Sequence, residues 1–237
     1  MFKHQAEKKA FVQQKFSSVS DKYDLLNSIL SLGIDRIWRN RTTDELRDET
    51  KDGLILDLCA GTLPLSRVIY QRLKRRVIAL DFCYDMLAYG QRRLRFKEQE
   101  AIVAICGDAE ALPFEDNVFD AATVAFGVRN LGNIQKGIKE LHRVLRPNGK
   151  LAILEFSRPS NPVFAPIYRF YLHKILPVTG GLISKDKAAY TYLAQSIEAF
   201  MPPHELCHLL KACGFYGVTY RPMTLGIVTL YTGKKHE

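Results

Sequence analysis

From Gly53 onward, short apolar runs alternate with stretches of helical periodicity, and this alternation constrains the fold more than any other feature. Five runs are separated by helical stretches: Leu54–Cys59, Arg76–Asp81, Ala101–Cys106, Phe119–Gly127 and Lys150–Ser157. Strands and helices that alternate in this way form βαβ units with a parallel sheet. Two further runs, Tyr216–Met223 and Gly226–Lys235, follow a helical stretch and are expected to pair antiparallel at the end of the chain. We therefore predict an α/β fold with a mostly parallel, seven-stranded, Rossmann-like sheet and helices on both faces.

The remaining segments flank or interrupt this sheet. Residues 1–50 have a polar, amphipathic pattern and are predicted to form an N-terminal helical cap. Residues 51–237 are predicted to form a single globular unit. Between the fifth and sixth strands lies a segment rich in aromatic residues, at about residues 160–200, which is expected to be a lid inserted into the sheet domain.

Composition limits the class of protein. The chain of 237 residues carries 34 Lys and Arg against 25 Asp and Glu, and its formal net charge of +9 suits either an anionic partner or solubility alone. Its five cysteines have no C-x-x-C spacing and no signal-peptide pattern precedes them, so we expect a cytoplasmic protein with reduced thiols and no metal site. The most apolar long segment, Pro162–Ile183, contains three prolines and three basic side chains, which excludes a membrane span.

Polar residues follow successive strands of the predicted sheet. In an open parallel sheet, ligands bind beyond the carboxyl ends of the strands. The first strand leads to Gly61 and the second ends at Asp81, 20 residues later, the spacing expected for a carboxylate that accepts hydrogen bonds from ribose hydroxyls. Asp108 and Ala109 follow the third strand, where an adenine edge would lie. Each aspartate alone could be a turn or capping residue, but their order at successive strand ends predicts a nucleoside-containing ligand.

The sequence of the loop after the first strand indicates which class of nucleoside-containing ligand is expected. It contains only Gly61, so the G-x-G-x-x-G fingerprint of dinucleotide binding is missing, and no Walker loop is present. S-adenosylmethionine has no pyrophosphate and needs less of a glycine loop. The strand order is that of class I methyltransferases, and S-adenosylmethionine is therefore the expected cofactor.

Longer motifs support this interpretation and extend it. They are FSSVSDKYDLLNSILSLGIDRIWRN (16–40), GDAEALPFEDNVFDAATVAFGVRNL (107–131), HRVLRPNGKLAILEFSRP (142–159) and YTYLAQSI (190–197). Through these motifs, nearly the whole chain resembles the ubiquinone/menaquinone biosynthesis C-methyltransferases of the UbiE type. The resemblance implies methylation of a ring carbon of a polyprenyl quinol, either demethylmenaquinol or the benzoquinol of the ubiquinone pathway.

The resemblance also implies roles for individual residues. Tyr23 matches a tyrosine that covers the cofactor, and Thr62, like Asp81, Asp108 and Ala109, matches a position that binds S-adenosylmethionine. Arg129 and Asn130, after the fourth strand, match a pair that acts at the quinol hydroxyl. Arginine is always charged, so Arg129 is expected to stabilise a phenolate or polarise a water rather than act as a base.

The first loop departs from the family pattern. Leu63 and Pro64 stand where the family has glycine and aspartate. Leucine tolerates a positive φ poorly and proline offers no N–H, although Pro64 suits the first turn of a helix. The N–H groups of Thr62 and Leu63 are expected to be available to the cofactor.

This departure leaves alternatives open. One is a repurposed or non-catalytic protein of this fold, and another is a methyltransferase for a different small apolar molecule. A nucleic-acid partner is not expected, because no Asn/Asp-Pro-Pro-aromatic stretch follows the fourth strand and no RNA-binding module is appended.

The aromatic segment suits an apolar substrate. Its aromatic residues and neighbouring cations fit a lid that admits a polyprenyl tail and contacts membrane lipid at the inner face of the membrane: Phe164, Tyr168, Arg169, Phe170, Tyr171 and Lys174. A helix packed on the sheet edge or a homodimer interface is the alternative. Within the same segment, His173 is a candidate proton acceptor by residue type, or else a packing histidine. Glu155, after the fifth strand, could be a second acceptor or pair with Arg158.

Overall fold

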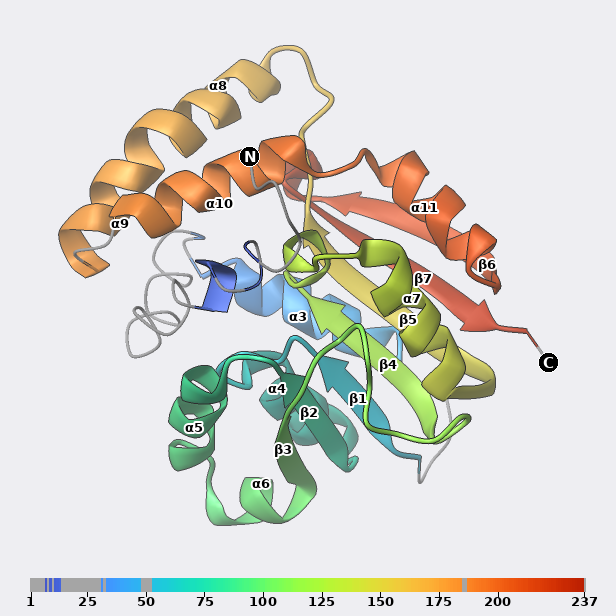
Figure 1. The fold of residues 1–237 in the computed structure, drawn as a ribbon. Helices are drawn as coiled ribbons and strands as arrows, with labels where there is room; N and C mark the ends of the chain where they lie inside the picture. Colours follow the sequence, from blue (N-terminus) through green and yellow to red (C-terminus); the bar gives the residue numbers. More distant parts are fainter. Residues whose placement is uncertain are drawn as a thin grey trace.

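The computed structural model describes residues 7, 9, 11–13, 31, 33–47, 53–184 and 187–236, with the backbone alone for 182–184 and 187. Its sheet has the strand order β3-β2-β1-β4-β5-β7-β6 (Figure 1). The strands are β1 (Ile55–Leu58), β2 (Val77–Asp81), β3 (Ile102–Cys106), β4 (Phe119–Ala125), β5 (Leu145–Phe156), β6 (Phe215–Met223) and β7 (Val228–Lys235). All pairings are parallel except those of β7 with β5 and β6. The predicted fold class is thereby confirmed.

The sheet is covered on both faces because its central strands are apolar on both sides. In β1 every residue is buried, and successive side chains point to opposite faces. Leu56 and Leu58 contribute to a cluster with helices α7 (Ile134–Val144) and α11 (Pro203–Ala212). Ile55 contributes to a second cluster on the other face, which includes residues of α4 (Pro64–Leu73) and α5 (Tyr84–Arg92). The described residues also form the helices α3 (Asp35–Asp44) and α6 (Phe96–Ala101).

Strand β5 begins earlier than the sequence predicts. The Pro147–Gly149 stretch, which precedes the predicted run Lys150–Ser157, lies inside the strand. Pairing with β4 jumps from Phe119↔Leu145 to Ala121↔Lys150, so the stretch forms an irregularity in an otherwise continuous strand. Asn148 there has a φ of 63°, a conformation that asparagine adopts more readily than most residues.

Helices follow β5 where the sequence placed the lid insertion. They are α8 (Phe164–Phe170), the π-helical turn η2 (Tyr171–Ile175), α9 (Leu176–Ser184) and α10 (Lys187–Ala199). α8, η2 and α9 run as one rod, and α10 returns beside it (Figure 1). A separate apolar cluster, with Tyr168 and Leu172 from the rod and Tyr190 and Ala194 from α10, holds them together. Among the helices that the structure describes, none has the length and hydropathy to cross a bilayer.

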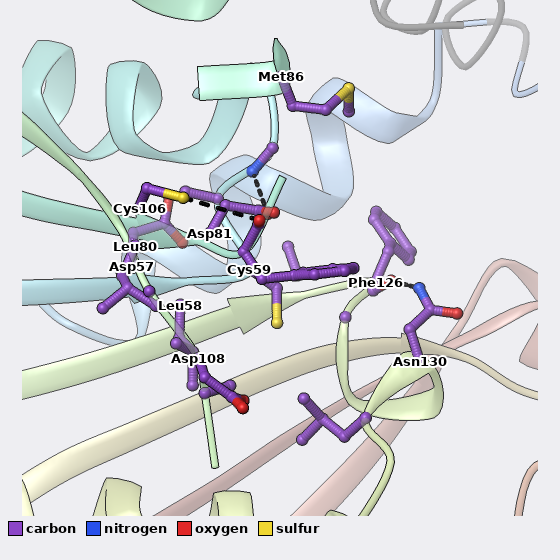
Figure 2. A pocket seen from close by; sticks show the side chains of 18 of the residues that line it. Asp57, Leu58, Cys59, Leu80, Asp81, Met86, Cys106, Asp108, Phe126 and Asn130 are labelled. Atoms are coloured by element: carbon purple, nitrogen blue, oxygen red, sulfur yellow. Dashed lines mark hydrogen bonds between the residues drawn. The ribbon is translucent and has the colours of Figure 1, made fainter. Parts of the chain in front are cut away.

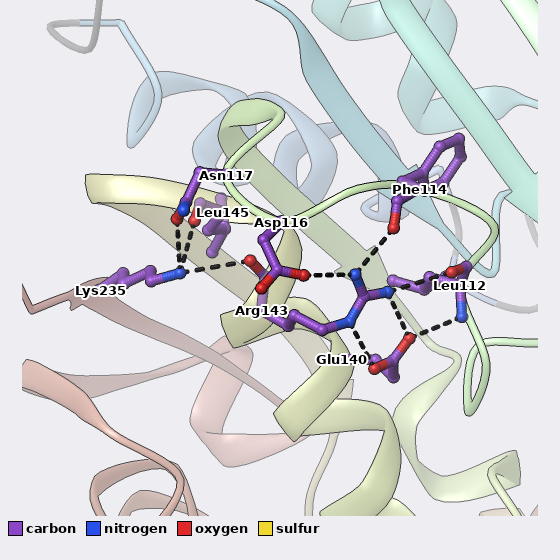
Figure 3. Close-up of polar contacts among 8 residues, drawn as sticks. All are labelled: Leu112, Phe114, Asp116, Asn117, Glu140, Arg143, Leu145 and Lys235. Atoms are coloured by element: carbon purple, nitrogen blue, oxygen red, sulfur yellow. Dashed lines mark hydrogen bonds and ion pairs between the residues drawn. The ribbon is translucent and has the colours of Figure 1, made fainter.

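A polar network anchors the loop between β3 and β4 (Figure 3). The Arg143 guanidinium on α7 donates to both oxygens of Glu140 and to Asp116, each at 2.8 Å. It also donates to the carbonyl oxygens of Leu112 and Phe114. These acceptors raise the pKa of Arg143 above its ordinary value. The network fixes the second half of the loop, and the first half, which carries Asp108, faces the site described next.

Candidate cofactor and substrate site

A cavity of about 400 Å³ lies at the carboxyl ends of β1, β2, β3 and β4. This volume is within the range of small-molecule and cofactor sites. Six of the predicted site residues line it: Gly61, Thr62, Asp81, Asp108, Ala109 and Asn130. Of the other two, Arg129 does not line the cavity, and Tyr23 lies outside the described residues. The cavity wall also includes residues that the sequence did not single out, among them Met86, Cys106 and Phe126 (Figure 2). Lys9 lines it as well.

The loop from β1 to α4 reverses the chain through three left-handed residues. Cys59, Gly61 and Leu63 have φ values of 57°, 54° and 68°. Leu63 is therefore in the conformation that glycine adopts without strain, and its side chain is fully buried against the second core cluster. Its N–H donates to the Ala60 carbonyl at 2.9 Å. The expectation that this N–H is available to a ligand is therefore wrong, because it closes the turn instead.

Asp81, at the end of β2, is held by the first loop. Its Oδ2 accepts the Gly61 N–H at 2.8 Å (Figure 2). Its Oδ1 accepts the Cys83 N–H, also at 2.8 Å. Burial raises the pKa of Asp81 to about 6, against the opposing effect of these hydrogen bonds. The Phe82 N–H also hydrogen-bonds this carboxylate, and of its about four acceptor positions the remainder is available to a ligand hydroxyl. The position and remaining acceptor capacity suit a ribose diol.

Asp57, at the end of β1, connects three elements. It accepts hydrogen bonds from the hydroxyls of Ser66 on α4, at 2.5 Å, and Thr123 on β4, at 3.0 Å. Burial raises its pKa to about 6. These bonds hold the first loop at a fixed distance from β4, so the carboxylate stabilises the cavity floor as well as lining it.

Asp108 and Glu110, after β3, meet a lysine from the N-terminal region. The Lys9 ammonium is 2.8 Å from Asp108 Oδ2 and 3.0 Å from Glu110 Oε2. Partial burial opposes the effect, but the hydrogen bond and charge of Lys9 lower the pKa of Asp108 overall. Glu110 is buried, and its Oε1 also accepts the N–H groups of Gly132 and Asn133. Glu110 thus connects Lys9 to the loop that follows β4.

The turn after β4 carries the predicted substrate residues. Phe126 has a φ of 61° and leads through Gly127 into the 3-10 turn η1 (Val128–Asn130). A Cβ at Gly127 would lie 2.3 Å from Cys59 Cβ, so this position must be glycine for the two loops to approach. The Asn130 Nδ2 donates to the Phe126 carbonyl at 3.4 Å, and the Tyr192 hydroxyl on α10 donates to Asn130 Oδ1 at 3.1 Å.

Arg129 points behind the cavity wall. Its Nη1 is 2.7 Å from Glu155 Oε1, and its backbone N–H donates to Glu155 Oε2 at 3.2 Å. Both side chains are buried, and the guanidinium lies over the Phe156 ring at 5.3 Å. The predicted ion pair between Glu155 and Arg158 is therefore wrong, because Glu155 pairs with Arg129 instead. From this place Arg129 holds η1 against β5 and makes no contact with the cavity.

His173 is likewise occupied elsewhere. Its Nε2 is 2.8 Å from Glu198, and neither residue lines the cavity. This geometry favours the packing interpretation of the histidine over that of a proton acceptor. An aromatic wall lies beside Asn130 instead: the Phe126 ring is 4.5 Å from Phe156 and 6.1 Å from Trp38, measured between centroids.

A model of the ubiE/COQ5 methyltransferase family matches residues 2–235. The chain belongs to this family. The resemblance noted in the sequence is thereby confirmed. The prediction of an S-adenosylmethionine-dependent methyltransferase is confirmed with it. The relatives include the demethylmenaquinone methyltransferase of Thermus thermophilus, 41% identical over 93% of this chain and 99% of that protein. The demethylmenaquinone methyltransferase of Mycobacterium tuberculosis is 42% identical over 94% of this chain and 92% of that protein.

Solved structures show the same fold at low sequence identity. A SAM-dependent methyltransferase from Thermotoga maritima superposes with a TM-score of 0.65 at 16% identity, over 94% of this chain and 98% of that one. The phosphoethanolamine N-methyltransferase 2 of Haemonchus contortus, in complex with S-adenosyl-L-methionine, gives 0.63 at 15% identity, over 84% of this chain and 52% of that one. These likenesses establish the class I methyltransferase fold.

Proposed function

We propose that this protein binds S-adenosylmethionine in the cavity and methylates a ring carbon of a polyprenyl quinol, with demethylmenaquinol as the first candidate. The observation that carries the proposal is the match to demethylmenaquinone methyltransferases over nearly the whole length of both chains. The benzoquinol of the ubiquinone pathway is the second candidate, because the resemblance noted in the sequence extends to methyltransferases of ubiquinone biosynthesis.

The residues of the cavity fit the cofactor. Asp81 has acceptor capacity for ribose hydroxyls, and Asp108 places a carboxylate after β3 for an amino group. Leu80 and Ala109 supply apolar contacts for a purine ring. The lining contains four carboxylates, Asp57, Asp81, Asp108 and Glu110, against two cationic side chains, Lys9 and Arg39. This balance favours a ligand that carries a sulfonium cation.

The chain's own task in the reaction is to bind and orient the ring. S-adenosylmethionine supplies an already electrophilic methyl group when it is bound, so alignment and a more nucleophilic ring carbon remain for the protein. Phe126, with Trp38 and Phe156 behind it, offers an aromatic wall for the quinol. Asn130, at the edge of this wall, contacts a quinol oxygen, and Arg129 and Glu155 keep its turn in place.

The proposed substrate resides in a membrane, and one face of the lid insertion suits contact with lipid. Val163, Ile167, Phe170 and Val178 are 72%, 59%, 60% and 52% exposed. Their spacing places them along one side of the α8–η2–α9 rod. We call this surface the exposed apolar row. The sequence predicted that Phe164, Tyr168 and Tyr171 would also face the lipid. In the structure these three side chains pack in the cluster with α10, so the exposed apolar row does not include them.

Charge favours lipid as the occupant of the exposed apolar row. Arg169 and Lys174 are exposed on the same rod, and residues 158–184 contain no Asp or Glu. Apolar side chains flanked by cations suit the boundary of an anionic bilayer, with the chain otherwise in the cytoplasm. The protein is accordingly proposed to bind the inner face of the membrane peripherally.

Vesicle sedimentation tests this contact. We expect the purified protein to sediment with vesicles that contain phosphatidylglycerol, and an Ile167→Ser/Phe170→Ser variant to remain in the supernatant. Phe96→Ser is the matched control, since Phe96 is 75% exposed on α6, at the β3 edge of the sheet. If the double variant sediments as the wild type does, or changes only the oligomeric state, the lipid contact is wrong and a homodimer interface takes its place.

Binding and product analysis test the reaction itself. Calorimetric titration with S-adenosylmethionine is expected to give micromolar affinity that is lost in Asp81→Ala. A substrate panel of demethylmenaquinol, the demethylated benzoquinol and RNA, analysed by mass spectrometry, then identifies the acceptor. Methylation of RNA alone, or cofactor binding with no methylated quinol, would reject the proposal.

A further inference from the structure

Tyr192 joins the lid insertion to the substrate side of the cavity. It lies on α10, 62 residues from Asn130 in sequence, and its hydroxyl donates to Asn130 Oδ1 at 3.1 Å. On the other side of the same amide, Nδ2 donates to the Phe126 carbonyl at 3.4 Å. Asn130 is therefore held at both ends of its amide while its side chain lines the cavity.

The two partners determine which way the amide faces. A backbone carbonyl only accepts hydrogen bonds, so the Phe126 oxygen selects the nitrogen of the Asn130 amide. The Tyr192 hydroxyl then meets the amide oxygen and occupies one of its two acceptor positions. Nδ2 carries two hydrogens, and among the described residues only the Phe126 carbonyl accepts one of them. The second N–H remains for a ligand in the cavity.

We infer that Tyr192 is a positioning residue for methyl transfer, because its hydroxyl holds Asn130 with an N–H directed at the oxygen of the bound quinol. The inference rests on the proposed quinol substrate. An N–H donor stabilises a phenolate more than a neutral hydroxyl, since hydrogen bonds to charged acceptors are the stronger ones. The phenolate, in turn, delivers electron density to the neighbouring ring carbon that receives the methyl group.

Contacts around Tyr192 support this role over simple packing. Ser196, four residues further along the same face of α10, accepts the Arg129 Nε at 3.3 Å. The lid insertion thus contacts two successive residues of η1 through two polar side chains. The ring of Tyr192 meets Phe11 at 5.3 Å between centroids, so ring and hydroxyl have separate partners. A substitution can therefore remove one and keep the other.

Tyr192→Phe is the direct test, because it removes the hydroxyl and keeps the ring contact with Phe11. Steady-state kinetics of quinol methylation should show kcat reduced about tenfold or more, with the KM for S-adenosylmethionine unchanged. The deficit should shrink as the pH rises, since a quinol with a less stabilised phenolate ionises at higher pH. Tyr168→Phe is the matched control, because that buried tyrosine lies on α8 and does not line the cavity.

A double-mutant cycle separates positioning from loss of folding. In an Asn130→Ala background, Tyr192→Phe should have almost no further effect on kcat, and both variants should melt as cooperatively as the wild type. An unchanged kcat and pH profile in Tyr192→Phe, or full additivity with Asn130→Ala, would overturn the inference and leave the proposed function intact. A wild-type protein that methylates no quinol would reject both.

Discussion

Leu63 offers a direct test of how the first loop is built. The residue has a φ of 68°, and its side chain is fully buried in the second core cluster. Backbone strain and burial therefore act in opposite directions at one position. Leu63→Gly removes both, and the sign of its effect on stability shows which is larger.

The expected balance favours burial. Truncating a buried leucine costs about 3–5 kcal/mol, whereas a left-handed conformation costs an L-residue about 1–2 kcal/mol. The free energy of unfolding of Leu63→Gly should therefore fall by about 2–3 kcal/mol, which lowers the Tm by roughly 5–10 °C for a chain of this size. Thermal and urea unfolding, followed by circular dichroism, measure it.

The other end of the same helix provides the matched control. Lys74 follows α4 with a φ of 56°, but its side chain is exposed, and its Nζ lies 5.3 Å from the centroid of the Tyr70 ring. Lys74→Gly relieves strain without opening the core, so the free energy of unfolding should rise by about 0.5–1 kcal/mol. If Leu63→Gly also stabilises the protein, packing does not hold this loop and the reasoning is wrong. Cofactor affinity should change little in Leu63→Gly, because the Leu63 N–H serves the Ala60 carbonyl.

Three further predictions concern the site. The affinity for S-adenosylmethionine should weaken as the pH falls through about 6, because Asp81, ionised above that pKa, loses acceptor positions when it is protonated. Titrations at pH 5 to 8 should show this dependence in the wild type and a flat, weaker profile in Asp81→Asn. Gly127→Ala should abolish cofactor binding or lower the Tm by several degrees, as its Cβ would collide with Cys59; normal binding and melting would show that the loops can separate. Glu155→Ala should lower the free energy of unfolding by about 3–5 kcal/mol in chemical denaturation, since it removes the carboxylate that balances the buried charge of Arg129; a loss below about 1 kcal/mol would contradict this.

The strands could be predicted from sequence because their signal is local. Apolar runs placed β1, β2, β3 and β4 within two residues of their observed bounds. The left-handed conformation of Leu63 was also foreseeable, because a glycine is usual there and glycine marks positive φ. The β5 irregularity at Asn148 was missed because a Pro-Asn-Gly stretch has the same residues in a turn and in a bulge.

The site contacts that the sequence did not predict join residues that lie far apart along the chain. Lys9 reaches Asp108 across 99 residues, and a lysine in a polar segment carries no local signal of that partner. Arg129 and Glu155 each looked like candidates for chemistry, yet only the tertiary structure shows that they pair with one another. The YTYLAQSI motif predicted the family, whereas the contact of Tyr192 with Asn130 required the fold of the lid insertion.

The central claim is methyl transfer to a quinol, and one measurement tests it most directly. The purified protein is incubated with S-adenosylmethionine carrying a trideuterated methyl group and with demethylmenaquinol in anionic vesicles, and the lipid extract is analysed by mass spectrometry. We predict menaquinol that carries three deuterium atoms on the ring methyl group, formed in equal amount to S-adenosylhomocysteine. Unlabelled demethylmenaquinol recovered unchanged, from protein that is folded and binds the cofactor, would contradict the account.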